Sequence, residues 1–470
     1  MKRRDLLKSS LLGGALATLP SNEVGAGNKT SNHLDSHLIA AEIVKKGPLI
    51  NLNRAYKVMH QEQLDGLIVT LPKNIFYFTG YHDHLAVRYA SPTSFALLSK
   101  DENKKMCIVM NQFIYYFSFI DGGFKLNSKD FLFTGWNKNN TGLEGGKNNG
   151  ELQEPIPSAP YTWTDIGEHP IGEIEENRLN ILTKKLNEVP ESADYDWALK
   201  KAIQYLELEK ALVGIDHPVI DQTIKKLDLN TKTIDGDHAL RRIQIIKSER
   251  EIELMKISAQ NNADASIAAI RQIRNGATHQ DLKSLFFSEC SKRGNIPSLL
   301  QIDTVNSEVF NKELKNGDSF AIDAVSHGFH YNGDFGRTVF LGEPSRSMKK
   351  ATDAISIGWD AVREQLKPGL RYSEIRTIGR EAMKKSGYNF SVAVTPHSIG
   401  LSHTDEPGKN GPGSFWQKDD LILQENMIIS VDLPVLNTGI GGTAHLEDLT
   451  LITNDGGEQI NDIGNRIIVL

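Results

Sequence analysis

Five side chains in the second half of this chain could together hold divalent metal ions. They lie at the ends of apolar, strand-like runs or beside glycines, and they are Asp323, Asp334, His397, Asp432 and Glu447. A carboxylate buried at the end of an apolar strand is costly unless something neutralises it. Each residue also has an ordinary alternative, because acids beside turns often cap backbone N–H groups, buried acids form ion pairs and many histidines are satisfied core residues.

The first two acids are predicted to lie on one β-hairpin. The pair Asn332-Gly333 stands between two strand-like runs, and an Asn-Gly pair is a strong hairpin signal. Asp323 and Asp334 would then sit on paired strands and could face one another. Taken alone, the two aspartates favour a structural role, so the prediction of a site depends on the other three residues.

Electrostatics links the five residues to metal chemistry. Four carboxylates in one pocket would repel and raise each other's pKa unless cations lay between them. Oxygen-rich ligation with one imidazole suits Mn, Co, Zn or Fe, and the sequence does not choose among these ions. Two such ions would lower the pKa of a bridging water to give hydroxide near neutral pH and would polarise a carbonyl, which is the chemistry of metal-dependent hydrolysis.

An α+β pattern over residues 241–470 is expected to position these side chains. Ser248 and Glu251 form a capping-box signal at a helix start, and Thr278 opens a second helix that is expected to end near Gly294. Strands are predicted over 319–324 and 335–341, helices over about 347–366 and 373–386, and strands again over 427–452. The pattern favours helices that cover an antiparallel sheet.

Before residue 241 the pattern changes to alternating helix-like and strand-like runs, with a helix predicted over 52–63 and a buried strand over 66–70. This alternation favours an α/β domain, and a chain of 470 residues is expected to form two domains. Residues 136–170 are rich in Asn, Gly and Pro, and we interpret them as a surface insertion or, less often, a lid.

The composition is that of an ordinary soluble globular protein, with 39% hydrophobic and 24% charged residues and a mean hydropathy of −0.35. The net charge of −6 gives no basic excess for nucleic acid, so no nucleic-acid partner is expected. Cys107 and Cys290 lie among apolar residues and are predicted to be two buried thiols rather than a disulfide.

The first 26 residues are typical of an export signal, with basic residues at 2–4, an apolar run at 11–19 and small residues at 24–26. Arg3 and Arg4 followed by Leu-Leu-Lys resemble the twin-arginine motif, which predicts a periplasmic or exported protein. A general secretory signal and a membrane-tethered N-terminus are the alternatives. After signal removal no stable membrane insertion is expected, and residues 27–50 are interpreted as a linker.

The chain resembles the pita-bread-fold metallopeptidase family, which includes Xaa-Pro aminopeptidases, prolidases, methionine aminopeptidases and creatinase. The five residues named above match the family's Asp, Asp, His, Glu and Glu ligands in order, with one acid exchanged. Five ordered matches are more specific than any single motif. Residues 74–80 resemble the Asn-Ile-Tyr-Tyr-Leu-Thr-Gly element of the creatinase-type N-terminal domain, and residues 241–253 resemble the entry into the catalytic domain.

The resemblance implies an α/β creatinase-type N-terminal domain over 51–240 and an α+β pita-bread catalytic domain over 241–470. It implies two divalent ions, manganese being one possibility, with Asp323 on one ion, His397 on the other, and Asp334 with Glu447 bridging. His403 would bind the substrate carbonyl or the oxyanion, and Asp432 stands where the family has a ligand that is often assigned proton transfer. These two residues are therefore the expected catalytic pair, in a homodimer whose partner completes the site.

Four departures from the family pattern limit what the resemblance implies. Asp432 replaces a glutamate, and the two histidines 397 and 403 are one residue closer than usual. His445 stands where proline-specific members have an arginine, and residues 301–315 lack their substrate-binding histidine, with Asn306 near that place. Arg337, in Asp-Phe-Gly-Arg-Thr where the family has Asp-Ile-Thr-Arg-Thr, is expected either to support the ligands or to form a surface ion pair.

Three functions follow from these residues. The leading hypothesis is a metal-dependent hydrolase of small peptide or amide substrates, similar to Xaa-Pro aminopeptidases or dipeptidases, with the proline preference weakened by the departures. The second is a lyase like the dimethylsulfoniopropionate lyases of this fold, in which an ion polarises a carboxylate and a base removes an α-proton. The third is a pseudoenzyme that only binds peptides, which Asp432 supports and which would need no bound ion.

Overall fold

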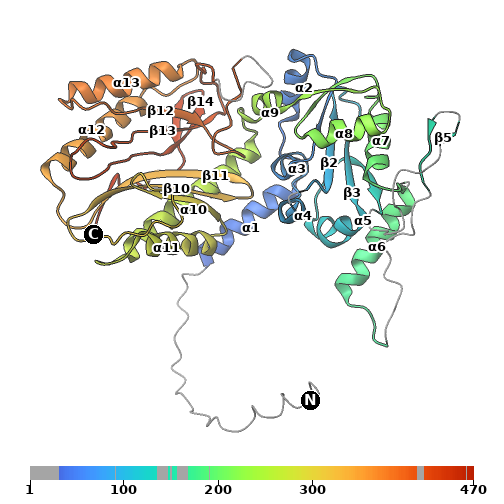
Figure 1. Ribbon diagram of the computed structural model, residues 1–470, viewed down its shortest axis with the longest axis horizontal. Helices are drawn as coiled ribbons and strands as arrows, with labels where there is room; N and C mark the ends of the chain where they lie inside the picture. Colours follow the sequence, from blue (N-terminus) through green and yellow to red (C-terminus); the bar gives the residue numbers. More distant parts are fainter. Residues whose placement is uncertain are drawn as a thin grey trace, which may run out of the picture.

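The computed structural model describes residues 31–89, 91–134, 147–148, 151–155, 168–189, 191–409, 418–461 and 463–470. The chain forms an α/β domain followed by an α+β domain, as the sequence predicted (Figure 1). Helix α9 (Asp237–Gln244) connects them and lies near the expected boundary. The predicted export signal lies outside the described residues, as does most of the 136–170 segment, of which a short hairpin, β5 (Lys147–Asn148) and β6 (Glu151–Leu152), is described.

A six-stranded mixed sheet forms the centre of the first domain, in the order β4-β3-β2-β1-β7-β8. Its strands are β1 (Gly66–Val69), β2 (Ser94–Ser99), β3 (Met106–Asn111), β4 (Ser128–Phe133), β7 (Leu212–Ile215) and β8 (Lys232–Asp235). The central strands are buried along their whole length, because helices cover both faces and the apolar runs leave no polar side. The helices are α2 (Leu52–Gln61), α3 (Pro72–Thr79), α4 (His84–Tyr89), α6 (Glu173–Glu188), α7 (Tyr195–Tyr205) and α8 (Pro218–Lys226).

Helix α1 (Ser31–Lys45) occupies most of the segment that we expected to be a linker. Its side chains Ala40, Ile43 and Val44 are buried in an apolar cluster to which both domains contribute, so this stretch is a packed element. Figure 1 shows α1 running beside α10 of the second domain. The linker interpretation is therefore wrong for residues 31–45, where apolar residues at helical spacing give the helix a buried face.

Two four-stranded sheets form the second domain, with strand orders β16-β11-β10-β9 and β12-β13-β14-β15. The first contains β9 (Ile296–Ile302), β10 (Ser319–Gly328), β11 (Tyr331–Phe340) and β16 (Ile467–Val469); the second contains β12 (Thr395–Ser398), β13 (Ile428–Asp432), β14 (Leu449–Thr453) and β15 (Gly456–Gln459). Helices α10 (Glu249–Gln272) and α11 (His279–Lys292) cover the first sheet, and α12 (Arg346–Arg363) and α13 (Tyr372–Lys385) cover the second (Figure 1). The two sheets therefore face each other between layers of helices.

The predicted caps at the starts of two helices are confirmed. Ser248 and Glu251 form the predicted capping box of α10, and Thr278 caps α11. The two cysteines are buried and free, as predicted. Within the part of the chain that the structure describes, no helix is both long enough and apolar enough to cross a bilayer.

The turn of the β10–β11 hairpin differs from the prediction. Phe329 and His330 form the two-residue turn, with φ of 47° and 66°, whereas Asn332 and Gly333 lie within β11. Gly333 is needed for packing, because a Cβ there would lie 2.7 Å from the Cβ of Asn262 on α10. The hairpin prediction holds, but its turn lies nearer to the first aspartate than the sequence indicated.

The tip of this hairpin contacts the first domain. His330 Nε2 lies 2.6 Å from His82 Nδ1, and the His330 ring lies 4.7 Å from the ring of Phe76 on α3. One continuous group of buried apolar side chains includes Ile75 and Phe76 of the first domain and Tyr331 and Leu449 of the second. The two domains therefore share a core at this junction.

Candidate metal centre

The five side chains predicted as ligands come together between the two sheets of the second domain. Three overlapping groups each place their potential ligand atoms within 4.8 Å of one another: Asp323, His445 and Glu447; His397, Asp432 and Glu447; and Asp334, His397 and His403. All five predicted residues belong to at least one group. Two histidines, His403 and His445, complete the set.

Strand pairing places the two aspartates of the hairpin on the same side of the sheet. Asp323 on β10 lies opposite Gly336, and Asp334 on β11 lies opposite Val325. Because Asp334 and Gly336 are two residues apart on one strand, both aspartates point to the same face. They are diagonal neighbours rather than the directly facing pair that the sequence indicated.

The second sheet supplies the other three residues. His397 on β12 lies opposite Ser430 on β13, and Asp432 ends β13. Glu447 precedes β14 and is tied to the first sheet, because its backbone N–H and carbonyl form hydrogen bonds of 3.1 and 3.2 Å with Gly336. This bridge joins the two sheets at the position of the last predicted ligand.

Arg337 supports the site from behind. Its guanidinium is fully buried, donates to the Glu447 carbonyl over 2.9 Å and to the Asn465 carbonyl over 2.8 Å, and pairs with Asp448 at 2.7 Å. Of the two roles considered from the sequence, support of the ligands is therefore the observed one. A surface ion pair is contradicted, because neither Arg337 nor Asp448 reaches the surface.

Two further residues hold the ligands and were missed in the sequence. Ser430 Oγ donates to Glu447 Oε1 over 2.5 Å, and Asn461 Nδ2 donates to the carbonyl of Asp334 over 2.7 Å. Ser430 could have been found, because it lies two residues before Asp432 on one strand and so shares its face. Asn461 lies in the segment after β15 and carries no such signal.

Several carboxylate oxygens of the cluster lack protein partners among the described residues. Asp323 Oδ1, Asp334 Oδ1 and Glu447 Oε2 are buried and have no hydrogen-bond partner within the part of the chain that the structure describes. Burial, followed by the neighbouring Asp334, raises the pKa of Asp323 to about 6 and raises that of Glu447 well above its usual value. Oxygen atoms that are buried, crowded and unpartnered fit divalent cations, which would balance their charge.

The pKa of Asp432 is shifted in the opposite direction to those of Asp323 and Glu447. Burial acts to raise its pKa, but its interactions with His445 and Glu447 and the charge of His397 hold the pKa below the usual range. Its Oδ2 lies 3.7 Å from His397 Nε2, and its Oδ1 lies 3.5 Å from His445 Nε2. The shorter side chain still reaches the cluster, so the exchange of glutamate for aspartate has not removed this carboxylate from the site.

His403 stands at the solvent side of the cluster, with 49% of its side chain exposed. Its Nε2 lies 2.9 Å from Asp334 Oδ2, and its ring lies 5.1 Å from that of His397. Burial lowers the pKa of His403, but Asp334 raises it more, to about 9. The first domain helps to hold this loop, since Lys73 on α3 donates to the Ser402 hydroxyl over 2.8 Å.

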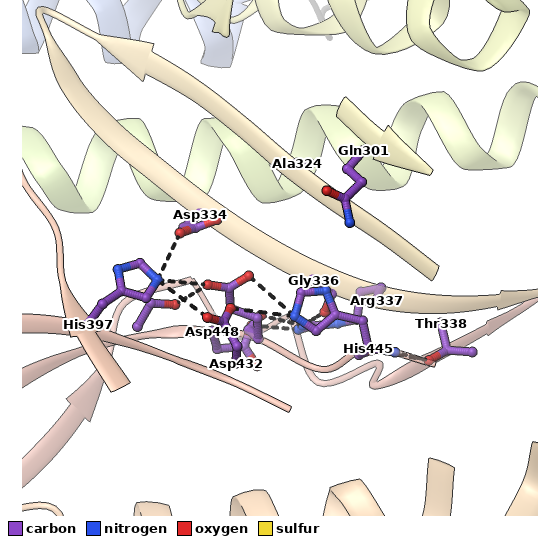
Figure 2. A network of polar contacts seen from close by, with 12 residues as sticks. Gln301, Ala324, Asp334, Gly336, Arg337, Thr338, His397, Asp432, His445 and Asp448 are labelled. Carbon is purple, nitrogen blue, oxygen red and sulfur yellow. Dashed lines mark hydrogen bonds and ion pairs between the residues drawn. The ribbon is translucent and has the colours of Figure 1, made fainter. Parts of the chain in front are cut away.

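His445 faces the cluster from the opposite side to His397 (Figure 2). Its Nε2 is buried, finds no hydrogen-bond partner in the described ranges and lies 3.6 Å from Glu447 Oε2. The sequence marked this residue only as a replacement for arginine. Its position two residues before Glu447 could have indicated that both side chains point the same way.

The region that lacks the family's histidine is also changed. Asn306, which lies near that place in the sequence, is exposed. Gln301 on β9 lies opposite Asp323, and Figure 2 shows its amide directed toward the side of the sheet that carries His445. The carboxylate cluster is therefore formed without a histidine from residues 301–315.

Comparisons with known proteins agree with this architecture. Residues 253–454 match metallopeptidase family M24, and residues 51–116 match the Creatinase/Prolidase N-terminal domain. An Xaa-Pro dipeptidase of Pyrococcus horikoshii is 26% identical over 284 residues, which cover 56% of this chain and 78% of that protein. An Xaa-Pro dipeptidase of Pyrococcus furiosus is 25% identical over 243 residues, which cover 49% and 67%.

Solved structures show the same two-domain fold. The Xaa-Pro dipeptidase from Bacillus anthracis aligns with a TM-score of 0.60 at 17% identity, over 92% of this chain and 100% of that chain. The prolidase from Pyrococcus horikoshii aligns with a TM-score of 0.57 at 19% identity, over 87% and 97%.

Proposed function

Because the chain joins a creatinase-type N-terminal domain to a catalytic domain of metallopeptidase family M24, we propose that it hydrolyses small peptide or amide substrates with two bound divalent ions. The convergence of four carboxylates with two buried imidazoles carries this proposal. Such a donor set is costly without cations, and the unpartnered oxygens of Asp323, Asp334 and Glu447 provide places for them.

Different residues would bind the metal ions, transfer the proton and contact the substrate carbonyl during hydrolysis. Asp323, Asp334, His397, Asp432 and Glu447 would hold the ions, which when bound supply an activated water and polarise the scissile carbonyl. Asp432, with 23% of its side chain exposed, is accessible for taking a proton from the attacking water and giving it to the leaving amine. His403, at the solvent side, would donate to the substrate carbonyl oxygen as negative charge develops there.

The substrate class is proposed to be broader than Xaa-Pro peptides. The named relatives include Xaa-Pro dipeptidases. This chain has His445 in place of the arginine of proline-specific members and no histidine in residues 301–315. We therefore expect dipeptides and N-acyl amides to be cleaved without a strict requirement for proline.

Export and assembly are separate proposals. The basic, apolar and small-residue pattern of residues 1–26 supports delivery to the periplasm through the twin-arginine pathway. A homodimer, in which the partner's first domain would complete the site, is proposed from the family resemblance alone. Cell fractionation with the arginine pair Arg3 and Arg4 changed to lysine tests export, and light scattering of the purified protein tests the dimer.

The central test combines elemental analysis with activity screening of the natively purified protein. We expect close to two divalent ions per chain and release of a free amine from members of a dipeptide and N-acyl library with Mn, Co, Zn or Fe restored. The variant Asp323→Asn should lose metal and activity together, whereas Asp228→Asn, in the first domain, should lose neither. A protein that binds metal but cleaves no member of the library would count against the hydrolase.

The same samples separate the alternatives. The changed substrate side, with His445 and without the upstream histidine, is the observation that favours a lyase. Release of dimethyl sulfide and acrylate from dimethylsulfoniopropionate would support that activity in place of hydrolysis. Native protein without metal, unaffected by added ions, would instead support a peptide-binding pseudoenzyme.

A further inference from the structure

We propose that His445 is itself a metal ligand, so that each of the two ions receives one imidazole, from His397 on one side and from His445 on the other. This inference rests on the proposed metal-dependent function and specifies how the second ion is held. It assigns a binding role to a residue that the sequence marked only as a departure from the family.

The spacing of the donor atoms is that of ligands around shared ions. Glu447 places Oε1 3.5 Å from His397 Nε2 and Oε2 3.6 Å from His445 Nε2. Asp432 spans the same two rings, with distances of 3.7 Å and 3.5 Å. Two donor atoms that bind the same ion, each at about 2.1 Å and in tetrahedral geometry, lie about 3.4 Å apart. All four distances are longer than a typical hydrogen bond and close to this value.

The ring nitrogen of His445 is unsatisfied without an ion. Its Nε2 is buried and has no hydrogen-bond partner among the described residues, with Asp432 Oδ1 3.5 Å away, and the ring is almost wholly buried. An unpartnered polar atom in such a place costs free energy, so a ligand for it is expected. With Asp323 and Glu447, each of which has an unpartnered oxygen, it forms one of the three groups that could hold an ion.

The backbone around His445 is built to admit the ring. A Cβ at Gly336 would lie 2.6 Å from the Cε1 and Nδ1 atoms of His445 and 2.8 Å from the Cβ of Glu447, so only glycine leaves this space. Thr338 Oγ1 accepts from the His445 N–H over 2.9 Å and donates to its carbonyl over 3.1 Å. The motif Asp-Phe-Gly-Arg-Thr has glycine where the resembled family has threonine, so Gly336 and His445 are two departures from that pattern that lie against each other.

His403 is less suited to this role. Half of its side chain is exposed, and its Nε2 already lies 2.9 Å from Asp334 Oδ2. It shares a potential ligand group with Asp334 and His397, and its ring contacts that of His397. His445 is the imidazole that reaches the Asp323 side, where no other described histidine is part of a ligand group.

An additional nitrogen donor has a chemical consequence. Imidazole suits Zn, Co, Fe and Ni better than it suits Mn, which prefers oxygen. With one imidazole on each ion, the two sites should differ less in metal affinity than if only one ion had an imidazole. Both sites should favour Co or Zn over Mn.

The test is titration of the metal-free full-length protein with Co²⁺, followed by visible absorption and by metal analysis after dialysis. The unaltered protein should bind two ions per chain. His445→Ala should keep one tight ion and bind the second at least tenfold more weakly, with loss of part of the Co²⁺ absorption band. Gly336→Thr, which leaves His445 in the chain but fills its space, should weaken the same ion.

Two further variants separate a ligand role from general damage. His397→Ala should weaken the other ion, giving a different residual Co²⁺ spectrum from that of His445→Ala. His327→Ala, on the same strand as Asp323 but in none of the ligand groups, should bind two ions with unchanged affinity. Circular dichroism and urea unfolding identify any variant that has not folded.

The inference is overturned if folded His445→Ala and Gly336→Thr both bind two ions with the affinity and spectrum of the unaltered protein. Unaltered protein that binds no Co²⁺ overturns the metal-dependent function instead, so the two failures are distinguishable. Weakening of one ion in both variants, with His327→Ala unaffected, supports the ligand.

Discussion

Arg337 and Asp448 form an ion pair with Nη2 2.7 Å from Oδ1, and neither side chain exposes more than 1% of its surface. The same guanidinium donates to the carbonyl of Glu447, so the pair fixes the backbone of a predicted ligand. A buried charge without its partner is strongly unfavourable, whereas an exposed pair contributes little.

We expect Arg337→Met to lower the free energy of unfolding by about 3–5 kcal/mol, because it leaves Asp448 buried and unpaired. Metal affinity should fall as well, since the Glu447 segment loses an anchor. Urea unfolding and Co²⁺ titration measure the two effects. Lys225→Met, which breaks the exposed pair with Asp221, is the control and should cost about 0–1 kcal/mol; an equal cost for both variants would contradict the argument.

The stability of the metal-free protein should depend on Glu251 between weakly acidic and neutral pH. Burial raises the pKa of this fully buried carboxyl to about 7, from a usual value of 4.5. Because the folded state holds the proton more tightly than the unfolded state, the contribution is complete below the unfolded pKa and is lost as pH rises through the folded pKa. At about 1.4 kcal/mol per pKa unit, the loss is on the order of 3 kcal/mol.

Glu251→Gln, which cannot ionise, should make this slope shallower between about pH 4.5 and 7.5, leaving the part that Asp323 and Glu447 contribute, as measured by urea unfolding at several pH values. Glu253→Gln, at an exposed position of the same helix, should retain it. Parallel pH profiles of the unaltered protein and Glu251→Gln would show that the carboxyl does not titrate in this range.

Removal of metal should destabilise the protein, since the ions bind the folded cluster and not the unfolded chain. At a free ion concentration one hundred times the Kd, bound metal contributes about 2.7 kcal/mol. A chelator should therefore lower the melting temperature, and added Co²⁺ or Zn²⁺ should restore it. Asp323→Asn is expected to show a smaller difference in melting temperature between chelator and added metal. If neither treatment changes the melting temperature of the unaltered protein, metal binding is refuted.

His403→Ala is expected to reduce kcat/KM by about 10²- to 10³-fold, if it donates to the developing oxyanion. Two ions per chain should still be bound, because the proposed ligands are unchanged. Steady-state kinetics and metal analysis of the same sample separate these outcomes. His60→Ala, at an exposed position of α2 in the first domain, is the control, and loss of one ion from His403→Ala would assign this residue to the metal instead.

Gly333→Ala tests the corrected position of the hairpin turn. The added methyl would meet Asn262 and Ala259 of α10, so we expect a loss of about 1–3 kcal/mol in unfolding free energy. If Asn332-Gly333 were an exposed turn, the methyl would meet no helix. Gly172→Ala, where only Glu175 Oε2 lies within 4 Å, is the control for the same substitution and should be near neutral.

The sequence predicted the elements whose signals are local. Ser248 and Thr278 cap their helices as expected. The four acids and one histidine that match the family's ligands in order also meet in one cluster. The hairpin turn was misplaced because the glycine of Asn332-Gly333 serves a close approach to α10, a long-range contact that no local pattern reveals.

Other features of the site depend on contacts between distant segments. Asn461 joins the backbone of Asp334 to Leu449, and Lys73 reaches the loop that carries His403 from another domain. The segment of helix α1 resembles a linker in sequence, because its buried face, at Ala40 and Val44, is recognisable only from the elements packed on it. Tertiary packing, which a single sequence does not display, decided each of these cases.

The core shared by the two domains has a consequence for how the molecule denatures. Phe76 of α3 and Tyr331 of the hairpin belong to one apolar group, and His330 contacts His82. Separation of the two domains at this junction would therefore remove contacts from the hairpin strands that carry Asp323 and Asp334. Heat or urea should therefore melt both halves in one cooperative transition, and a fragment beginning at residue 241 should hold its ions poorly even if it folds.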